Sequence, residues 1–199
     1  DDTDDSAFSA GAAYVFVRSE TEWTQQAYLK AATAHWGDQF GSAVSVSGDT
    51  VIVGAPTMDT SPGQNQGGAV VFYRSGTTWA QQAILIPSNI GIAEFVFGFS
   101  VSVEGNRVVV GAPLEASSSV GVDGNQSDQS AYQSGAAYVF VRDGTTWTQQ
   151  AYLKASNTDA PDNFGWSVAL SGDTLAVGAP FEASSDTGVN GSQADNAAS

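Results

Sequence analysis

One loop of the sequence brings several oxygen-bearing side chains close together. Asp123, Asn125, Ser127 and Asp128 follow one another at short spacing, and Glu115 precedes them in the same loop. Calcium binds about six to eight oxygen atoms from carboxylates, carbonyls and water. We therefore expect Ca²⁺ as a cofactor here, with these five residues as candidate metal ligands. An ordinary loop is the competing interpretation, since Asp, Asn and Ser also bond to backbone groups in turns.

A second loop has the same kind of composition later in the chain. It contains Glu182, Asp186, Asn190 and Asp195, and like the first it follows a Gly-Ala-Pro tripeptide. Two similar loops after the same tripeptide indicate a structural unit that occurs more than once.

Tryptophans form the other group of candidate site residues. Trp23, Trp79 and Trp147 recur at one place in a repeated segment, which is typical of a packing role. Trp36 and Trp166 have no matching tryptophan in every copy, so they are the candidates for ligand binding. An aromatic ring can stack on a sugar ring as well as pack in a core. The expected ligand is therefore a protein or a glycan.

Catalytic chemistry has little support in the sequence. His35 is the only histidine and the chain has no cysteine, so neither a histidine-based triad nor a thiol nucleophile is indicated. Carboxylates are abundant, but abundance in acidic loops is not an arranged acid and base. We assign no catalytic residue and predict that the chain is not an enzyme.

The charge balance excludes another class of partner. The formal net charge is −15, from 21 acidic against 6 basic residues, which leaves few cations to neutralise phosphates. Nucleic acid is therefore not an expected partner. Apolar residues occur in runs much shorter than a bilayer requires, so no membrane span is predicted either.

The candidate residues are positioned by a segment that occurs three times. Each copy opens with Phe-Gly, runs through two valine- or leucine-containing stretches and closes with Gly-Ala-Pro. Glycine followed by Asp or Asn joins the two stretches, which suits a two-residue hairpin turn. A second segment, with a tryptophan strand after it, is also present three times and reads GAAYVFVR, GGAVVFYR and GAAYVFVR. The first segment starts at Phe40, Phe97 and Phe164, and the second at Gly11, Gly67 and Gly135.

This pattern predicts an all-β chain of antiparallel four-stranded blades, the unit of a β-propeller. We expect a three-blade segment of 12 strands that is open or completed by another copy. Phe40, Phe97 and Phe164 are expected in the core between blades. The single repeat region 1–199 divides into a half blade at 11–30, a blade at 40–86, a blade at 97–154 and a half blade at 164–179.

In these motifs the chain resembles the FG-GAP repeats of integrin alpha-type β-propellers, and more closely those of bacterial extracellular proteins. The strings SGDTLAVGAP, GAAYVFVR and WTQQAYLKAS carry the resemblance over nearly the whole chain. It implies a secreted or cell-surface module for adhesion or protein interaction. The calcium loop that the family usually places between the first two strands of a blade is not matched, because only short turns such as Gly48-Asp49 stand there.

The two ends of the sequence are complementary halves of one blade. The half blade at 11–30 resembles the third and fourth strands of a blade, and the half blade at 164–179 resembles the first and second strands. Propeller rings close with about four to eight blades. We therefore expect a longer propeller, or self-association through the terminal half blades into a ring or a filament. Two alternative functions remain: a building block of a surface fibre or coat that assembles head to tail, and a carbohydrate-binding, lectin-like propeller.

Overall fold

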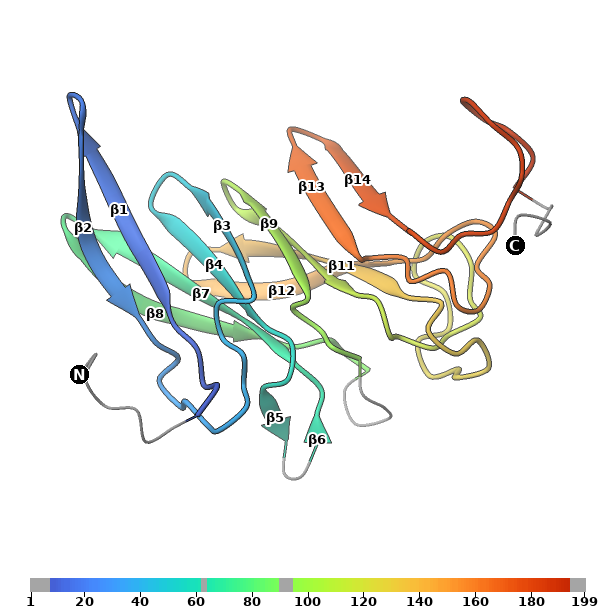
Figure 1. The fold of residues 1–199 in the computed structure, drawn as a ribbon, viewed down its shortest axis with the longest axis horizontal. Helices are drawn as coiled ribbons and strands as arrows, with labels where there is room; N and C mark the ends of the chain where they lie inside the picture. Colours follow the sequence, from blue (N-terminus) through green and yellow to red (C-terminus); the bar gives the residue numbers. More distant parts are fainter. Residues whose placement is uncertain (1–7, 62–63, 90–94, 194–199) are drawn as a thin grey trace.

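The computed structural model of the chain describes residues 8–61, 64–89 and 95–193 (Figure 1). These residues form strands, turns and loops, and every ladder between named strands is antiparallel. Within these ranges the chain has no helix of the length and apolar character that crossing a membrane requires. The predicted all-β fold of antiparallel four-stranded units is confirmed.

Two complete four-stranded sheets form the centre of the chain. In each sheet the strands lie in sequence order from one edge to the other, β3-β4-β7-β8 and β9-β10-β11-β12. The strands are β3 (Ala43–Ser47), β4 (Thr50–Ala55), β7 (Gly68–Ser75), β8 (Thr78–Leu85), β9 (Ser100–Glu104), β10 (Arg107–Ala112), β11 (Ala136–Asp143) and β12 (Thr146–Leu153).

A two-stranded half sheet lies at either end of this row (Figure 1). Strands β1 (Ala13–Ser19) and β2 (Glu22–Leu29) match the third and fourth strands of a complete sheet, and β13 (Ser167–Ser171) and β14 (Thr174–Gly178) match the first and second. A further hairpin of β5 (Asp59–Ser61) and β6 (Gln64–Asn65) follows β4. The repeat pattern did not predict this hairpin, because it occurs after only one of the Gly-Ala-Pro tripeptides.

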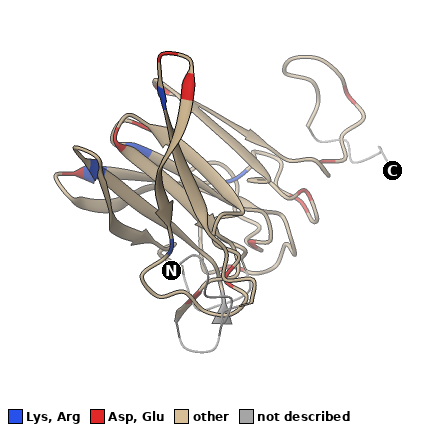
Figure 2. Ribbon diagram, turned by 60° about the vertical axis from the view of Figure 1, so that its left-hand side comes forward, with Lys and Arg blue, Asp and Glu red and all other residues tan. Residues whose placement is uncertain are grey.

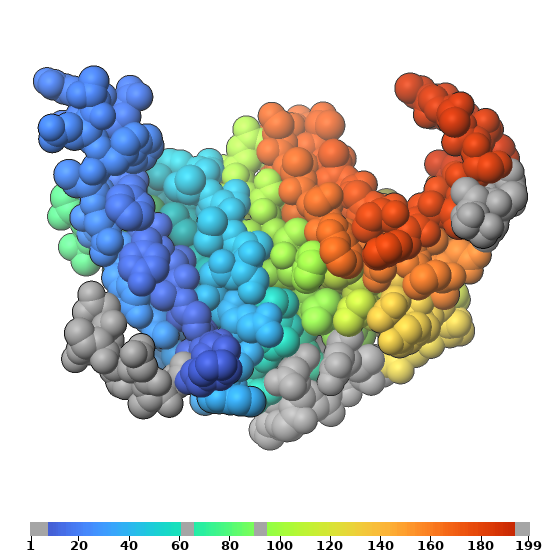
Figure 3. All heavy atoms as spheres, viewed as in Figure 1, coloured from blue at the N-terminus to red at the C-terminus, as the bar shows by residue number. Residues whose placement is uncertain are grey.

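The first strands of successive sheets lie side by side and line the hollow of an arc. Figure 3 shows this arc, hollowed between the β1–β2 hairpin and the loop after β14. The backbone N–H of Val103 in β9 donates to the Ser45 hydroxyl of β3 at 3.1 Å, and that of Leu170 in β13 donates to Ser102 of β9 at 3.0 Å. Neighbouring sheets are thus joined by hydrogen bonds near the hollow.

The core lies between the sheets in two clusters. Val51 and Val53 of β4 pack toward the β1–β2 hairpin, whereas Ile52 of the same strand packs toward the second complete sheet. Because β4 is buried on both faces, its sequence is a continuous apolar run without polar alternation. Phe40 and Phe97 lie in this core as predicted, whereas Phe164 is only half-buried.

The repeated glycines lie where neighbouring sheets approach most closely. A Cβ added to Gly111, in the Gly-Ala-Pro of one sheet, would lie 2.0 Å from the carbonyl oxygen of Gly165, in the Phe-Gly of the next. No side chain fits at that distance, so both motifs serve the packing of sheet on sheet.

Candidate functional site

A buried ion pair fixes the loop that joins β10 to β11. The Lys154 ammonium, just after β12, donates to the Glu115 carboxylate at 2.9 Å and to the Ser134 hydroxyl at 2.7 Å. Both charged side chains are fully buried. Burial lowers the pKa of Lys154, and the Glu115 charge opposes that shift. The pair therefore anchors this loop to the outer strand of its own sheet.

Backbone hydrogen bonds strengthen the same contact. The N–H of Lys154 donates to the carbonyl of Gly121, and the N–H of Asp123 donates to the carbonyl of Tyr152, each at 2.8 Å. The Asp123 carboxylate in turn accepts the N–H of Tyr152 at 2.9 Å. The loop thus adds a short ladder along the end of β12.

Two of the remaining predicted calcium ligands, Asn125 and Asp128, also accept hydrogen bonds from protein donors. The Asn125 side-chain oxygen accepts the Ser127 N–H at 3.0 Å. Asp128 accepts the N–H and the hydroxyl of Ser118 and the hydroxyl of Ser130. These bonds lower the pKa of Asp128 to about 2, because each of them stabilises the charged carboxylate.

Each of the three carboxylates among the five predicted ligands accepts hydrogen bonds from different protein groups. Glu115 is held by Lys154, Asp123 by β12 and Asp128 by two serines. Among the described residues no group of three or more acidic or histidine side chains could hold a metal ion. Calcium binding by this loop stays a prediction, which calorimetric titration of the chain with Ca²⁺ would test.

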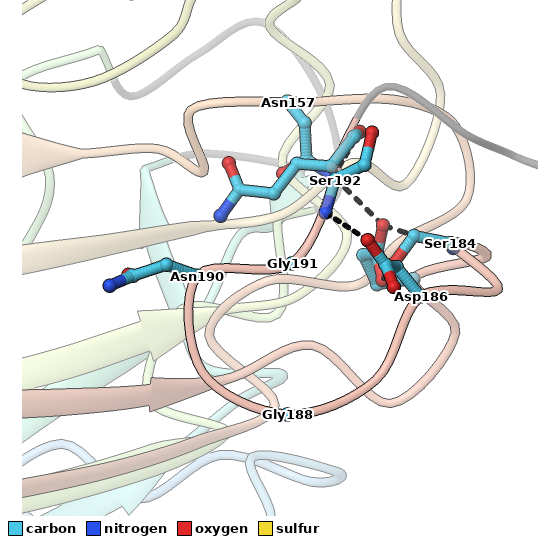
Figure 4. A pocket seen from close by; sticks show the side chains of 9 residues that line it. Asn157, Ser184, Asp186, Gly188, Asn190, Gly191 and Ser192 are labelled. Atoms are coloured by element: carbon cyan, nitrogen blue, oxygen red, sulfur yellow. Dashed lines mark hydrogen bonds between the residues drawn. The ribbon is translucent and has the colours of Figure 1, made fainter.

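The second acidic loop, after β14, surrounds a polar pocket. The pocket has a volume of about 250 Å³ and is lined mainly by loop residues 182–193 (Figure 4). Glu182 accepts Asn157 and the Ser184 hydroxyl, each at 2.8 Å, and no cation of the described residues pairs with it. Asp186 accepts the N–H groups of Ser192 and Thr187, which lowers its pKa. Asp195 lies outside the described residues.

The two candidate ligand-binding tryptophans lie in separate aromatic clusters. Trp36, between β2 and β3, is 74% exposed, and its ring centroid is 6.2 Å from that of Phe8. Trp166, just before β13, has its ring centroid 4.8 Å from Phe99 and 5.8 Å from Phe181. The structure therefore offers two separate aromatic surfaces, and a ligand role for either tryptophan stays a prediction.

The repeated tryptophans pack between sheets, as predicted, wherever a sheet precedes them. The indole N–H of Trp147 in β12 donates to the side-chain oxygen of Gln82 in β8, and that of Trp79 in β8 donates to Gln26 in β2, each at 2.8 Å. Trp23 in β2 has no preceding sheet among the described residues and is exposed.

Apolar surface is exposed at the β1–β2 end of the row. Tyr14 and Phe16 of β1 are 55% and 52% exposed, whereas the matching Tyr138 and Phe140 of β11 are 0% and 4% exposed. In the complete sheet β11 pairs with β10, and β1 lacks such a partner among the described residues. A groove of about 180 Å³, lined by β1, β3 and the start of β4, lies at this place.

Sequence reasoning missed the Glu115–Lys154 pair and the glutamine acceptors. Glu115 was assigned to a metal because its loop is acidic, and its lysine partner lies 39 residues further along the chain. The sequence contained one signal for this pair, because Glu115 recurs as Glu182 and Lys154 recurs as Lys30 at matching positions of the repeat.

Comparison with known protein families finds the same threefold repeat in the chain. A family model described as FG-GAP repeat matches the chain three times, over residues 23–72, 79–140 and 147–196. No curated protein matches the chain. Each match starts at a fourth strand, so one sequence repeat spans parts of two sheets.

Proposed function

Because this chain belongs to the FG-GAP repeat family, we propose that it is a non-catalytic, secreted or cell-surface module for protein interaction and adhesion. FG-GAP repeats are typical of extracellular or surface proteins and of β-propeller interaction modules. The first partner that the geometry favours is another copy of the chain. Assembled head to tail, the module would also serve as the building block of a surface fibre or coat.

The observation that carries this proposal is the pair of incomplete sheets. The β1 edge, meaning the edge of β1 opposite β2, has no partner strand among the described residues and exposes two aromatic side chains that a complete sheet buries. The β14 edge, meaning the edge of β14 opposite β13, likewise has no partner strand in the described ranges, and a third strand occupies this position in both complete sheets. An exposed, unpaired strand is a template for pairing with another chain. Each edge has the strand type that the other requires.

Sedimentation velocity over a wide range of concentration tests self-association. We expect the apparent mass to rise above 20.5 kDa as concentration increases. Phe16→Asp on the β1 edge should keep the chain monomeric, whereas Tyr132→Asp, at an exposed aromatic residue in the β10–β11 loop, should not. A wild-type chain that is monomeric at every concentration would contradict the proposal.

Glycan binding is a second candidate, favoured by the exposed pair of Phe8 and Trp36. Two neighbouring exposed rings are suited to stack on a sugar. Glycan-array binding by the wild-type chain that is lost in Trp36→Ala and retained in Trp23→Ala would support this function. Binding unaffected by Trp36→Ala and by Trp166→Ala, or no binding at all, would remove it.

A further inference from the structure

The loop that forms the pocket after β14 has a counterpart in the same chain, the β10–β11 loop, where a lysine side chain occupies the matching position. Residues 181–193 align without a gap on residues 114–126, so Glu182 matches Glu115 and Asn190 matches Asp123. The filled loop closes on Lys154, whose ammonium bonds to Glu115. In the pocket of loop 181–193, Glu182 has the same place but no cation beside it among the described residues.

The residue that would fill the pocket is also present in this chain, at the other end of the row. Residues 23–30 read WTQQAYLK, identical to residues 147–154, so Lys30 follows β2 as Lys154 follows β12. Lys30 is half-buried, its ammonium donates to the Gly11 carbonyl at 2.8 Å, and it has no acidic partner among the described residues. The cation and the carboxylate of one repeated ion pair are therefore separated in the chain.

We propose that the loop 181–193 pocket is a socket for Lys30 of a second copy, with the ammonium on Glu182. This rests on the proposed self-association and identifies its contact. The loop backbone at Gly188 and Asn190 would bond to the end of β2, as Gly121 and Asp123 bond to Tyr152 and Lys154. Strand β1 of the second copy would then pair with β14.

The complete sheets predict the strand register of this junction. Thr50 lies opposite Tyr73 in the first sheet, and Arg107 lies opposite Val141 in the second. The matching residues are Thr174 in β14 and Val17 in β1. These two should therefore lie opposite each other, one from each copy.

A second hydrogen bond of the repeat also lacks its partner at the same junction, independently of the ion pair. Gln26 and Gln82 each accept an indole N–H from the next sheet. The third residue of this series, Gln150 in β12, is exposed and has no such donor among the described residues, and Trp23 is the tryptophan left without an acceptor. In the proposed junction, β2 of the second copy follows β12, which brings Trp23 to Gln150.

The local charges at Lys30 and Glu182 favour a second copy at this junction, whereas the net charge opposes it. The chain carries −15 overall, and the acidic residues that the structure describes lie mostly in turns and loops without gathering on one sheet face (Figure 2). Two such chains repel each other on average. A buried cation–carboxylate contact at a defined place provides both specificity and a compensating attraction.

Charge reversal tests the socket in the full chain. Lys30→Glu and Glu182→Lys each place like charges together, and we expect each to weaken self-association by roughly 100-fold or more. An equimolar mixture of the two variants restores an opposite pair at both junctions, so it should associate within about tenfold of wild type. Asp143→Lys, which has the same charge change as Glu182→Lys at the exposed end of β11, should associate like wild type.

Disulfide trapping gives a second measurement that does not depend on the charge variants. The chain has no cysteine, so Val17→Cys and Thr174→Cys in one chain introduce the only thiols. Oxidation should yield covalent dimers or longer species, whereas Tyr14→Cys with Thr174→Cys, which is out of register, should not. Association that is unchanged in both charge variants, or no cross-link in the Val17–Thr174 variant, would overturn the socket while leaving self-association intact. A monomeric wild type would overturn both.

Discussion

At the scale of single residues, the buried Glu115–Lys154 pair is the charged contact on which the β10–β11 loop depends. Removing one member of a buried pair leaves the other charge without compensation, which costs about 3–5 kcal/mol. We expect Lys154→Met to lower the free energy of unfolding by that amount in urea denaturation. Glu115→Leu combined with Lys154→Met should recover most of the loss. A single variant as stable as wild type would contradict the anchoring role.

The Asp128 carboxylate gives a second residue-scale prediction. Its pKa is about 2 in the folded chain, below the usual aspartate value of 3.8, because Ser118 and Ser130 donate to it. A lowered pKa stabilises the fold above the unfolded value, and this contribution is lost as the pH falls from about 3.8 through about 2. NMR titration of the Asp128 carboxyl should give the low value, and Ser118→Ala should raise it. An unchanged pKa in Ser118→Ala would refute the assigned cause.

At the scale of elements, the tryptophan strands join one sheet to the next through glutamine. The Gln82 side chain accepts the Trp147 indole N–H, whereas Gln150 in the matching position has no donor among the described residues. We expect Gln82→Ala to cost about 1 kcal/mol of stability in the monomer, since a typical hydrogen bond contributes that much. Gln150→Ala should leave the monomer unchanged in the same thermal denaturation. An equal loss of stability in both variants would show that Gln82 contributes through its own strand and not through the hydrogen bond to Trp147.

The sequence repeat and the sheet are different units. Each family match runs from a fourth strand into the following sheet, as 23–72 runs from β2 into β7. One repeat therefore contains both sides of a sheet-to-sheet contact, such as Leu29 at the end of β2 and Val51 and Val53 of β4, which lie in one core cluster. This offset explains why the repeats cannot be cut apart at sheet boundaries without losing packing.

At the scale of the whole molecule, net charge and the proposed junction act in opposite directions. Long-range repulsion between two chains of charge −15 weakens with salt, because the Debye length falls from about 30 Å at 0.01 M to about 8 Å at 0.15 M. A buried ion pair is screened much less. We therefore expect self-association, measured by sedimentation, to become tighter across this salt range. Weaker association at higher salt would show that exposed charges hold the copies together.

The sequence by itself determined the local elements of this protein. Valine-containing stretches predict strands, and Gly48-Asp49 joins Ser47 to Thr50 in the predicted two-residue turn. The repeats predicted four-stranded sheets, in which short turns join the first pair and the last pair of strands, whereas longer loops such as 113–135 join the second strand to the third. Local patterns could not supply the β5–β6 hairpin or the role of Glu115, because the first is not repeated and the second depends on a lysine far along the chain.

Only the tertiary structure decided which repeated surfaces are buried. The octapeptide GAAYVFVR occurs at 11–18 and at 135–142, yet Tyr14 is exposed and Tyr138 is fully buried. Both segments form the same strand with the same register to the strand that follows. The difference is that β11 has β10 beside it and β1 has no such neighbour among the described residues. Burial depends on what lies across the strand and the sheet face, which identical local sequences do not specify.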